Sequence, residues 1–371
     1  MERFVVELKG RERSYPVCVG YGAYGHFLPE LLVRSGWHRL ALITHPEIME
    51  LHGRELVNVL VTFMGERELH RFTFPQGEEN KNLDTVARFI DFMLEREFTR
   101  SDVVLAFGGG VVGDVAGFAA GIYHRGMRYY QLPTTLMAMV DSAVGGKTGI
   151  DHHGVKNLVG VFWQPEAVIS ELGVLATLPG REIKNGWAEV VKYGFLYDEG
   201  LLGTSEVFLR EGLAGVDVEE VVVTCARYKA EVVREDETDD KGIRAMLNYG
   251  HTFGHALEAL TGFSDLRHGE AVAVGMMMAA RVSELTGLSG PGLYEKHRTL
   301  LLPLVSEAPI DWRFDPSDVY RNMAADKKKK GVLKLVLLEE PERARLVDEP
   351  SPDVLLRAIG EVLEDINLNR P

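Results

Sequence analysis

The first part of the chain alternates short apolar runs with stretches of helical spacing, and this alternation limits the possible folds more than any other feature. RLALIT (39–44), DVVLAF (102–107) and YYQLPTT (129–135) have the length and apolar character of buried strands. Between the first two lies LDTVARFIDFMLERE (83–97), whose apolar residues recur at helical spacing. Strands that alternate with helices predict a parallel sheet covered by helices on both faces.

After about residue 165 the pattern becomes helical. Four stretches predict helices, namely 181–198, 218–237, 247–262 and 270–287. The last is apolar almost all round, so we expect it to be buried, with Met276, Met277 and Met278 filling the core. The predicted fold class is α/β plus α, with a Rossmann-like parallel-sheet domain over 1–165 followed by a mostly helical domain over 166–371.

Charge and composition restrict the partners. The 371 residues include 41 Lys and Arg against 55 Asp and Glu, a net charge of −14. This balance disfavours nucleic acid and anionic membranes, although a local basic pocket can still bind a small anion. The charged N-terminus is unlike a signal peptide, and no apolar run reaches the roughly 18 residues of a membrane helix. Cys18 and Cys225 form no metal-like pair, so we expect reduced thiols in a cytoplasmic protein.

A glycine-rich turn follows the apolar run at 102–107. In VVLAFGGGVVGDVAG, Gly108, Gly110 and Gly113 fulfil the pattern G-x-G-x-x-G. Such glycines let a phosphate approach the backbone at the N-terminus of the next helix. The acidic residue that the ordinary dinucleotide fingerprint carries about 20 positions later is missing. Two interpretations stay open: a dinucleotide bound in an unusual way, or a tight turn without a ligand.

A second glycine cluster, DSAVGGKTGI (141–150), ends like a P-loop but has Asp141 where the first glycine belongs. We therefore exclude a nucleoside triphosphate site. Lys147, with Lys156 and Asn157 shortly after it, predicts a cationic pocket for a phosphate or carboxylate.

Three histidines, His251, His255 and His268, lie close together in the sequence, and Glu189 could add a carboxylate. Zinc binds His nitrogens and carboxylate oxygens, and a catalytic zinc keeps a position open. The metalloprotease pattern H-E-x-x-H is absent because position 252 is Thr. Spacing alone does not choose the ligands, and ordinary polar residues on a helix are the competing interpretation.

Arg244 lies one helical turn before Asn248, which lies three residues before His251, so we expect all three side chains on one side of a helix. An Arg guanidinium can bind a carboxylate through two hydrogen bonds. A surface ion pair is the competing interpretation for this arginine.

Together these segments resemble the 3-dehydroquinate synthase family of sugar phosphate cyclases, from about residue 70 to about 340. The resemblance is carried by PQGEENK, GGGVVGDVAGFAA, HRG, PTTL, VDSAVGGKTGI, KNLVG, LATLPGRE, WAEVVKYG, LNYGHTFGHALE, HGEAVAVGM and DKK. It implies a reaction of the shikimate route to aromatic amino acids, in which a seven-carbon keto-acid phosphate, DAHP, becomes 3-dehydroquinate and phosphate. In that reaction NAD takes a hydride and returns it, phosphate is eliminated between these steps, and an aldol reaction closes the ring.

The resemblance also implies one NAD, one divalent metal (zinc or cobalt), a small anionic sugar-phosphate substrate and a homodimer. One alternative is a sibling cyclase acting on sedoheptulose 7-phosphate or glucose 6-phosphate, whose substrates lack the carboxylate. The others are a polyol dehydrogenase that releases NADH and a catalytically silent NAD-binding protein.

Site residues are implied by the same resemblance. The implied metal ligands are Glu189, His251 and His268. The implied catalytic residues are His255, Lys147, Lys192, Asp141 and Asn248. The implied substrate contacts are Asn157, Lys229, Arg244, Lys327 and, from a second subunit, Arg125. The implied NAD contacts are Gly77, Glu78, Lys81, Gly109, Gly110, Asp114, Thr134, Thr135, Lys147, Lys156, Thr177, Leu178 and Glu182. His45 stands where relatives usually have an acidic residue facing the cofactor.

Overall fold

The computed structural model describes residues 1–8, 13–33, 36–262, 265–330 and 333–369. The chain forms two compact units. The first consists of Met1–Pro179 with Val218–Thr238, and the second of Gly180–Asp217 with Asp239–Pro371. Among the described helices, none combines the length and the apolarity that crossing a bilayer requires.

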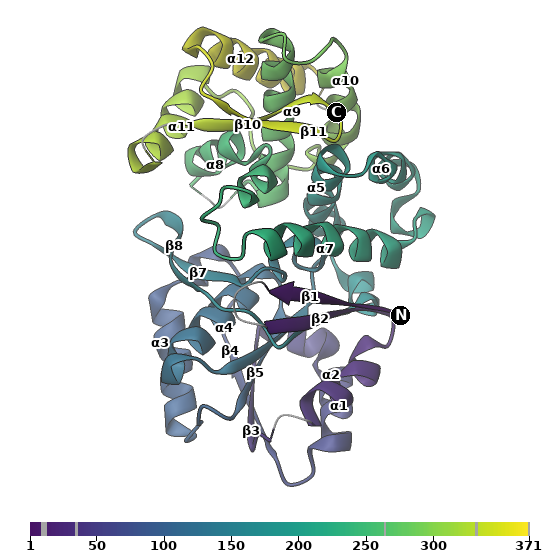
Figure 1. Ribbon diagram of the computed structural model, residues 1–371, viewed down its shortest axis with the longest axis vertical. Helices are drawn as coiled ribbons and strands as arrows, with labels where there is room; N and C mark the ends of the chain where they lie inside the picture. Colours follow the sequence, from purple (N-terminus) through teal and green to yellow (C-terminus); the bar gives the residue numbers. More distant parts are fainter. Residues whose placement is uncertain (9–12, 34–35, 263–264, 331–332, 370–371) are drawn as a thin grey trace. The chain divides into compact units, whose positions relative to one another are not determined.

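A seven-stranded sheet organises the first unit, in the order β1-β2-β9-β6-β5-β3-β4 (Figure 1). Its strands are β1 (Glu2–Leu8), β2 (Arg13–Gly20), β3 (Arg39–Thr44), β4 (Glu68–Thr73), β5 (Val103–Gly108), β6 (Arg128–Pro133) and β9 (Ala167–Glu171). All neighbours pair in parallel except β1, which pairs antiparallel with β2 at one edge. A separate hairpin joins β7 (Lys147–His152) to β8 (Val155–Phe162). The predicted parallel sheet is confirmed.

Helices cover this sheet on both faces. They are α1 (Ala23–Val33), α2 (Pro46–Met64), α3 (Leu83–Glu95) and α4 (Gly110–Ile122), with α7 (Val218–Glu235) alongside β1 and β2 (Figure 1). Every residue of β5 is buried, as a parallel strand covered on both faces requires. Amphipathic α3 buries Val86, Phe89 and Met93 in the core beside β5 and α4. The predicted strands at 39–44, 102–107 and 129–135 and the helix at 83–97 agree with β3, β5, β6 and α3 to within two residues at each end.

The two units divide the chain differently from the predicted boundary between 165 and 166. The first unit continues to Pro179 because β9 inserts between β2 and β6 in the sheet. It also includes α7, because this helix packs against β1 and β2. A helical pattern therefore does not assign a segment to the helical unit, since a sheet also needs helices to cover it.

Helices dominate the second unit, which also contains one two-stranded hairpin (Figure 1). The helices are α5 (Gly180–Leu196), α6 (Glu199–Glu211), α8 (His251–Leu260), α9 (His268–Leu285), α10 (Leu293–Leu301), α11 (Pro316–Lys330) and α12 (Pro352–Leu368), and the strands are β10 (Lys334–Glu340) and β11 (Arg343–Asp348). Helix α9 is buried from Gly269 to Ala280 and packs against α5, α8, α10, α12 and β10. Met276, Met277 and Met278 are wholly buried, which confirms their role as core residues.

The predicted helix at 247–262 is shorter than expected. A 3-10 helix, η6 (Arg244–Asn248), ends before Gly250, which has left-handed backbone angles and precedes α8. Arg244 and Asn248 therefore do not share a continuous helix with His251, and the expectation that all three project to one side of a helix is wrong. Gly250 is needed here because a Cβ atom would lie 2.8 Å from the backbone of Val272 and Met276 in α9.

Candidate functional site

Glu189 of α5 and the first residues of α8 and α9, His251 and His268, meet in the second unit. The Nε2 atoms of His251 and His268 each lie 3.8 Å from Oε1 of Glu189. One ligand atom from each of the three residues falls within 4.8 Å of the others. Two atoms bound at about 2.0–2.2 Å to one zinc ion lie roughly 3–4 Å apart, so this spacing suits a single divalent metal.

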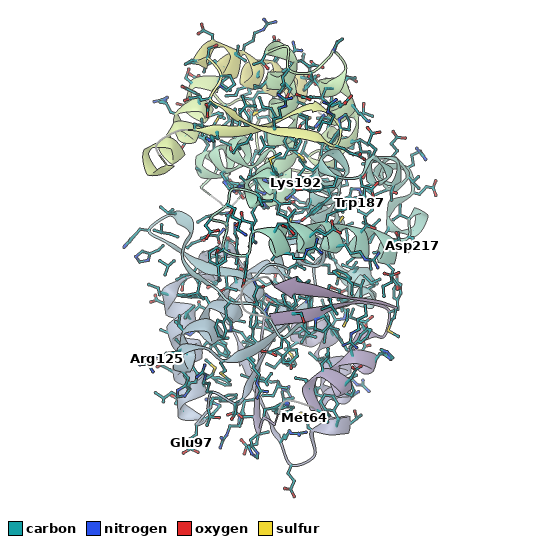
Figure 2. The ribbon with its side chains drawn as sticks, viewed as in Figure 1. Met64, Glu97, Arg125, Trp187, Lys192 and Asp217 are labelled. Carbon is teal, nitrogen blue, oxygen red and sulfur yellow. The ribbon has the colours of Figure 1, made fainter. Side chains whose placement is uncertain are left out.

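The chemistry of these three groups also suits a metal. Glu189 is fully buried, and neither of its carboxylate oxygens accepts a hydrogen bond from a described residue. A buried carboxylate is costly unless positive charge compensates it, and a metal ion would add to the charge that Lys192 already supplies. Lys192, one turn along α5, forms an ion pair with Oε2 (Figure 2 labels Lys192). Burial, and then the positive charge of Lys192, hold the pKa of His251 well below its ordinary value, so this imidazole is neutral and able to bind a metal.

Close backbone contacts bring the three helices together. A Cβ atom on Gly269, the second residue of α9, would lie 1.9 Å from the carbonyl oxygen of Asn185 in α5. The side-chain oxygen of Asn185 accepts a hydrogen bond from the Gly269 amide at 2.6 Å. A Cβ atom on Gly275 would lie 2.0 Å from the carbonyl oxygen of Gly250. These contacts place the first residue of α9 against α5 and α8, which carry the other two candidate ligands.

Other predicted residues surround this cluster. His255 is exposed on α8, and its ring lies 5.6 Å from that of His251 and 6.1 Å from that of His268, measured between ring centroids. Arg244 is buried in η6, whereas Asn248 at the end of η6 is exposed. Lys327 falls within α11, but its side chain lies outside the described residues.

Glu182 lies in the first turn of α5, in the second unit, and it is the one predicted cofactor contact found there. Its Oε2 atom accepts a hydrogen bond from Asn185 at 3.0 Å, and Oε1 pairs with Arg267 at 3.0 Å. Both partners are close in sequence to residues that assemble the metal cluster.

The glycine-rich turn links β5 to α4 in the first unit. Gly109 is the N-cap residue of α4 and has no side chain that could cap this N-terminus. A Cβ atom on Gly109 would lie 3.1 Å from the Thr135 side chain, and one on Gly110 would lie 3.2 Å from Ser142 Oγ. The turn therefore leaves backbone N–H groups at a helix N-terminus where any side chain would be crowded by its neighbours, which suits a phosphate.

Two hydroxyls beside the turn reinforce this interpretation. Thr134 Oγ1 and Ser142 Oγ are buried and have no hydrogen-bond partner within the described part of the chain. The Thr134 amide donates to the Gly108 carbonyl at 3.0 Å, which fixes the residue beside the turn. Buried polar groups are normally satisfied, so these hydroxyls fit a site for a bound polar molecule such as a dinucleotide. Residue 142 was not among the predicted contacts; only its place after Asp141 in the second glycine cluster pointed to it.

Lys81 links two sets of predicted residues. Its buried ammonium group contacts Asp114 of α4 at 2.6 Å, Asn157 of β8 at 2.6 Å and Glu78 at 3.7 Å. Burial lowers the pKa of Lys81, but the carboxylates of Asp114, Glu78 and Asp151 together outweigh it and hold that pKa above its ordinary value, so the group stays charged. Asn157, predicted to contact the substrate, therefore also contacts a predicted cofactor residue.

Asp141 and Lys229 form a second pair in the first unit. Asp141 lies in a π-helical turn (Ala138–Ser142), and its Oδ2 atom is 2.8 Å from Lys229 Nζ of α7. Asp141 was predicted to contact hydroxyl groups of the substrate, and Lys229 was predicted to contact the substrate carboxylate. Because α7 belongs to the first unit, the structure brings these two residues together although they are far apart in sequence.

The remaining predicted residues also lie in the first unit. They are Gly77 beside the 3-10 turn of Glu78, Lys147 at the exposed start of β7, Lys156 on β8, Thr177 and Leu178 at the end of the 3-10 turn after β9, and Arg125 after α4. His52 of α2 lies 2.7 Å from the Thr177 hydroxyl. His45 precedes α2 and is buried, and its Nδ1 atom lies 2.9 Å from the Phe74 carbonyl.

Comparison with known proteins agrees with this arrangement. Models of the 3-dehydroquinate synthase N-terminal and C-terminal domains match residues 71–185 and 186–329. The chain is 41% identical over 372 residues to a 3-dehydroquinate synthase of Vibrio atlanticus, covering 97% of this chain and 98% of that protein. A near full-length match at this identity reflects common descent, not only a common fold.

Solved structures of related cyclases share the fold. A 2-deoxy-scyllo-inosose synthase complexed with carbaglucose-6-phosphate, NAD+ and Co2+ is 25% identical, with a TM-score of 0.82 over 98% of this chain and 99% of that one. A 2-epi-5-epi-valiolone synthase from Streptomyces hygroscopicus, with NAD+ and Zn2+ bound, is 24% identical, with a TM-score of 0.80 over 96% and 97%. The fold class predicted from the sequence is confirmed. From its matching domains and its near full-length relative, the chain belongs to the 3-dehydroquinate synthase family.

Proposed function

We propose that this protein is a 3-dehydroquinate synthase, which converts DAHP into 3-dehydroquinate and inorganic phosphate as a carbon–oxygen lyase dependent on NAD and a divalent metal. The observation that carries the proposal is the cluster of buried Glu189 with half-buried His251 and His268, whose spacing and donor atoms suit one metal ion. The near full-length similarity to a 3-dehydroquinate synthase supports the choice of substrate.

The two cofactors bind different parts of the chain in this proposal. Glu189, His251 and His268 hold zinc or cobalt, which would polarise a substrate hydroxyl and the ketone formed from it. The turn at Gly109 and Gly110 holds NAD, which would accept a hydride and return it within one turnover. The other NAD contacts are the remaining residues that the sequence implied, together with Ser142.

Proton transfer is assigned to His255. It lies one helical turn after His251 and is exposed, so a bound substrate can reach its imidazole. A neutral histidine can accept the hydroxyl proton as the alcohol is oxidised. Lys192 and Asp141 hold the reacting hydroxyl groups. Both already lie beside an opposite charge, Glu189 and Lys229 respectively, which fixes their positions before substrate binds.

The two anionic ends of the substrate need separate positive groups. Buried Arg244, with Lys229, binds the carboxylate, because a guanidinium can donate two parallel hydrogen bonds to it. Lys147, Asn157, Asn248 and Lys327 bind the phosphate. In the elimination the carbon–oxygen bond to phosphate breaks while the neighbouring C–H proton is lost. We assign that proton to the leaving phosphate, so no separate protein base is required.

We further propose a cytoplasmic homodimer in which Arg125 contacts the phosphate bound by the partner subunit. Consecutive residues His124 and Arg125 have φ angles of 50° and 61°, and both are exposed. Positive φ at a residue other than glycine stores strain of about 1–3 kcal/mol and is common at functional sites. Figure 2 labels Arg125 at the periphery of the first unit, where a second subunit could receive it. The two cysteines are free, which suits a reducing compartment.

A sibling cyclase is the second candidate, because the solved structures with the same fold include 2-deoxy-scyllo-inosose synthase. Sugar phosphates without a carboxylate give a buried arginine such as Arg244 nothing to bind. This residue, and the sequence Gly145-Gly146-Lys147-Thr148, favour the dehydroquinate synthase.

Turnover assays distinguish the candidates. The metal-loaded protein with NAD is incubated with DAHP, sedoheptulose 7-phosphate or glucose 6-phosphate, and phosphate release and absorbance at 340 nm are followed together. We expect phosphate from DAHP with no net NADH. Phosphate from sedoheptulose 7-phosphate alone, or turnover of glucose 6-phosphate alone, would identify a sibling cyclase. Accumulating NADH would identify a dehydrogenase, and no turnover of any of them would contradict an enzymatic role in this class.

A further inference from the structure

Both candidate histidine ligands have an acceptor at the ring nitrogen that faces away from Glu189. Their Nε2 atoms point to Glu189, at 3.8 Å in each case. His251 Nδ1 lies 3.1 Å from the Tyr249 carbonyl oxygen, whereas His268 Nδ1 lies 3.4 Å from Oε1 of Glu258. One ligand is thus held by a neutral backbone group and the other by a carboxylate.

Glu258 has no part in the chemistry proposed above, yet its position is unusual for a carboxylate. It is wholly buried on α8, three residues after His255 and seven after His251, so the three side chains follow one face of that helix. Burying a carboxylate is costly unless a donor or a positive charge compensates it. The Nδ1–H group of His268, at the start of the neighbouring helix, is such a donor.

We propose that Glu258 is a positioning residue for the metal site, acting through His268. By accepting a hydrogen bond from Nδ1–H it leaves the lone pair of His268 on Nε2, directed at the metal, and fixes the plane of the ring. A carboxylate in this place also makes the imidazole a stronger ligand. This inference rests on the proposed metal site but concerns a residue outside it.

An alternative use of the same groups is less favourable. Ligand atoms of His255, Glu258 and His268 also lie within 4.8 Å of one another and could hold an ion of their own. His268 would then give Nδ1 to one ion and Nε2 to the other, so its ring would have to lose both N–H protons. With a neutral ring, one nitrogen carries the proton, which suits the hydrogen bond to Glu258.

Metal affinity tests the proposal without any turnover. The apo-protein is titrated with Zn2+ against a chromophoric chelator, and the d–d absorption spectrum of the Co2+ form reports ligand geometry. Glu258→Gln preserves size but removes the charge, and we expect about 10–100-fold weaker binding with a changed cobalt spectrum. Glu258→Asp keeps the charge but withdraws it by one methylene. The zinc affinity of this variant should lie between those of wild type and the Gln variant.

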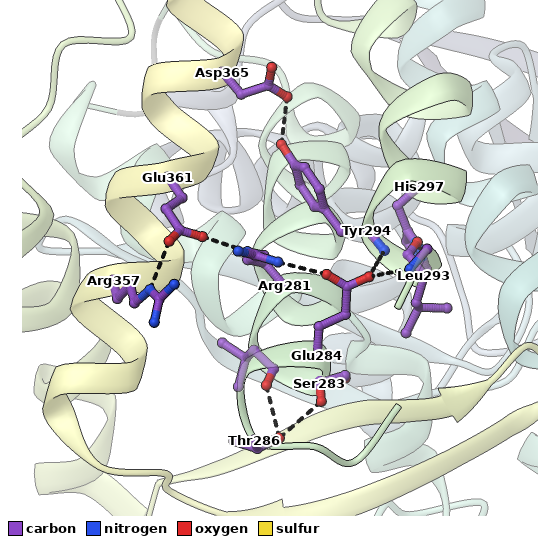
Figure 3. Close-up of polar contacts among 12 residues, drawn as sticks. Arg281, Ser283, Glu284, Thr286, Leu293, Tyr294, His297, Arg357, Glu361 and Asp365 are labelled. Carbon is purple, nitrogen blue, oxygen red and sulfur yellow. Dashed lines mark hydrogen bonds and ion pairs between the residues drawn. The ribbon is translucent and has the colours of Figure 1, made fainter. Parts of the chain in front are cut away.

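Glu284→Gln is the matched control, since Glu284 supports structure at the other end of α9. Its carboxylate accepts hydrogen bonds from the amides of Gly292 and Tyr294, at 2.8 and 3.0 Å, and pairs with Arg281 at 2.8 Å (Figure 3). Gln can still accept from the two amides through its oxygen but loses the ion pair with Arg281, which should lower the melting temperature slightly and leave zinc affinity within twofold of wild type.

Three results would overturn the proposal. One is a folded Glu258→Gln protein, judged by circular dichroism, that binds zinc within twofold of wild type. Another is a loss of zinc affinity in Glu284→Gln as large as that in Glu258→Gln, which would show that general destabilisation causes the effect. The third is two zinc ions per wild-type chain, one of them lost in Glu258→Gln. If Glu189→Gln and His268→Ala also left zinc affinity unchanged, the metal site of the proposed function would fail as well.

Discussion

The candidate cofactor turn of the first unit and the candidate metal cluster of the second are constructed in different ways. The turn is one continuous segment, from β5 through Gly109 and Gly110 into α4, and it would offer a ligand backbone N–H groups with hydroxyls beside them. The metal cluster draws Glu189, His251 and His268 from three helices. A local segment can retain its geometry when the packing around it changes, whereas a site shared among helices depends on every contact between them.

The predictions use this contrast. Substitutions that disturb helix packing in the second unit should affect metal binding strongly, whereas substitutions in the turn should have small effects confined to NAD.

Gly269→Ala should abolish metal binding. The new Cβ atom would lie 1.9 Å from the Asn185 carbonyl oxygen, so α9 must move away from α5 and carry His268 with it. Overpacking of this kind costs about 1–3 kcal/mol or more. We expect bound metal, measured by elemental analysis, to fall to background, with a lower melting temperature. Gly203→Ala, in an exposed part of α6 with open space around it, is the control and should stabilise the fold slightly. Equal metal content in both variants would refute the role of the backbone contact.

Arg244→Ala should reduce kcat/KM for DAHP by about 2–4 kcal/mol in transition-state free energy, because a buried pair with the substrate carboxylate is lost. Metal content should not change, since Arg244 lies in η6, outside the three ligand helices. Steady-state kinetics with DAHP provide the measurement. A kcat/KM within error of wild type would exclude Arg244 from carboxylate binding.

Acid should destabilise the second unit through His297. Burial lowers the pKa of His297 to about 3, and the ring lies between the Tyr249 hydroxyl, at 2.7 Å from Nε2, and the Leu293 carbonyl, at 2.8 Å from Nδ1. The unfolded histidine binds a proton near pH 6.5 and the folded one does not, so stability is complete above pH 6.5 and declines as the pH falls towards 3. The expected loss at pH 5 is about 2 kcal/mol. In urea titrations His297→Gln should be less stable at pH 7 but have a shallower acid slope; an unchanged slope would contradict this assignment.

Gly110→Ala should weaken NAD binding only modestly, by roughly five- to tenfold or about 1 kcal/mol. The added methyl group would lie 3.2 Å from Ser142 Oγ, a tight contact that a small side-chain shift can relieve. Titration of NAD by calorimetry measures the loss. Zinc content should remain at the wild-type level, and a joint loss of NAD and zinc would show that the two sites are not independent.

The parts that the sequence predicted best are those in which the signal is local. The apolar run before Gly108 and the glycine spacing after it determine a strand, a turn and a helix within one segment, and β5 and α4 agree with that prediction. The metal ligands could be proposed only as candidates from spacing, because their meeting depends on contacts between distant segments. Gly269 against Asn185 is such a contact, and a single sequence gives no sign of it.

Other differences between the predicted and the observed structure also arise from contacts between segments that are distant in the sequence. Helix α7 has an ordinary helical pattern, and nothing in that pattern indicates that it packs on β1 and β2. The left-handed conformation of Gly250, which separates Arg244 from α8, is required by the closeness of α9. Glu258 was overlooked although its spacing from His251 and His255 along one helix face was visible in the sequence. A carboxylate on the same helix face as two candidate metal-binding histidines is therefore also a sequence signal for a residue that supports the site.

The burial of α9 slows the exchange of its backbone amide protons with solvent. From Gly269 to Ala280 every residue is buried, so the amide protons of that stretch reach water only when the surrounding unit opens. In deuterium oxide this stretch should therefore keep its protons far longer than the exposed loops, which exchange within seconds. His268 is its first residue, so the imidazole is anchored at the end of a segment that exchanges only when the unit around it opens.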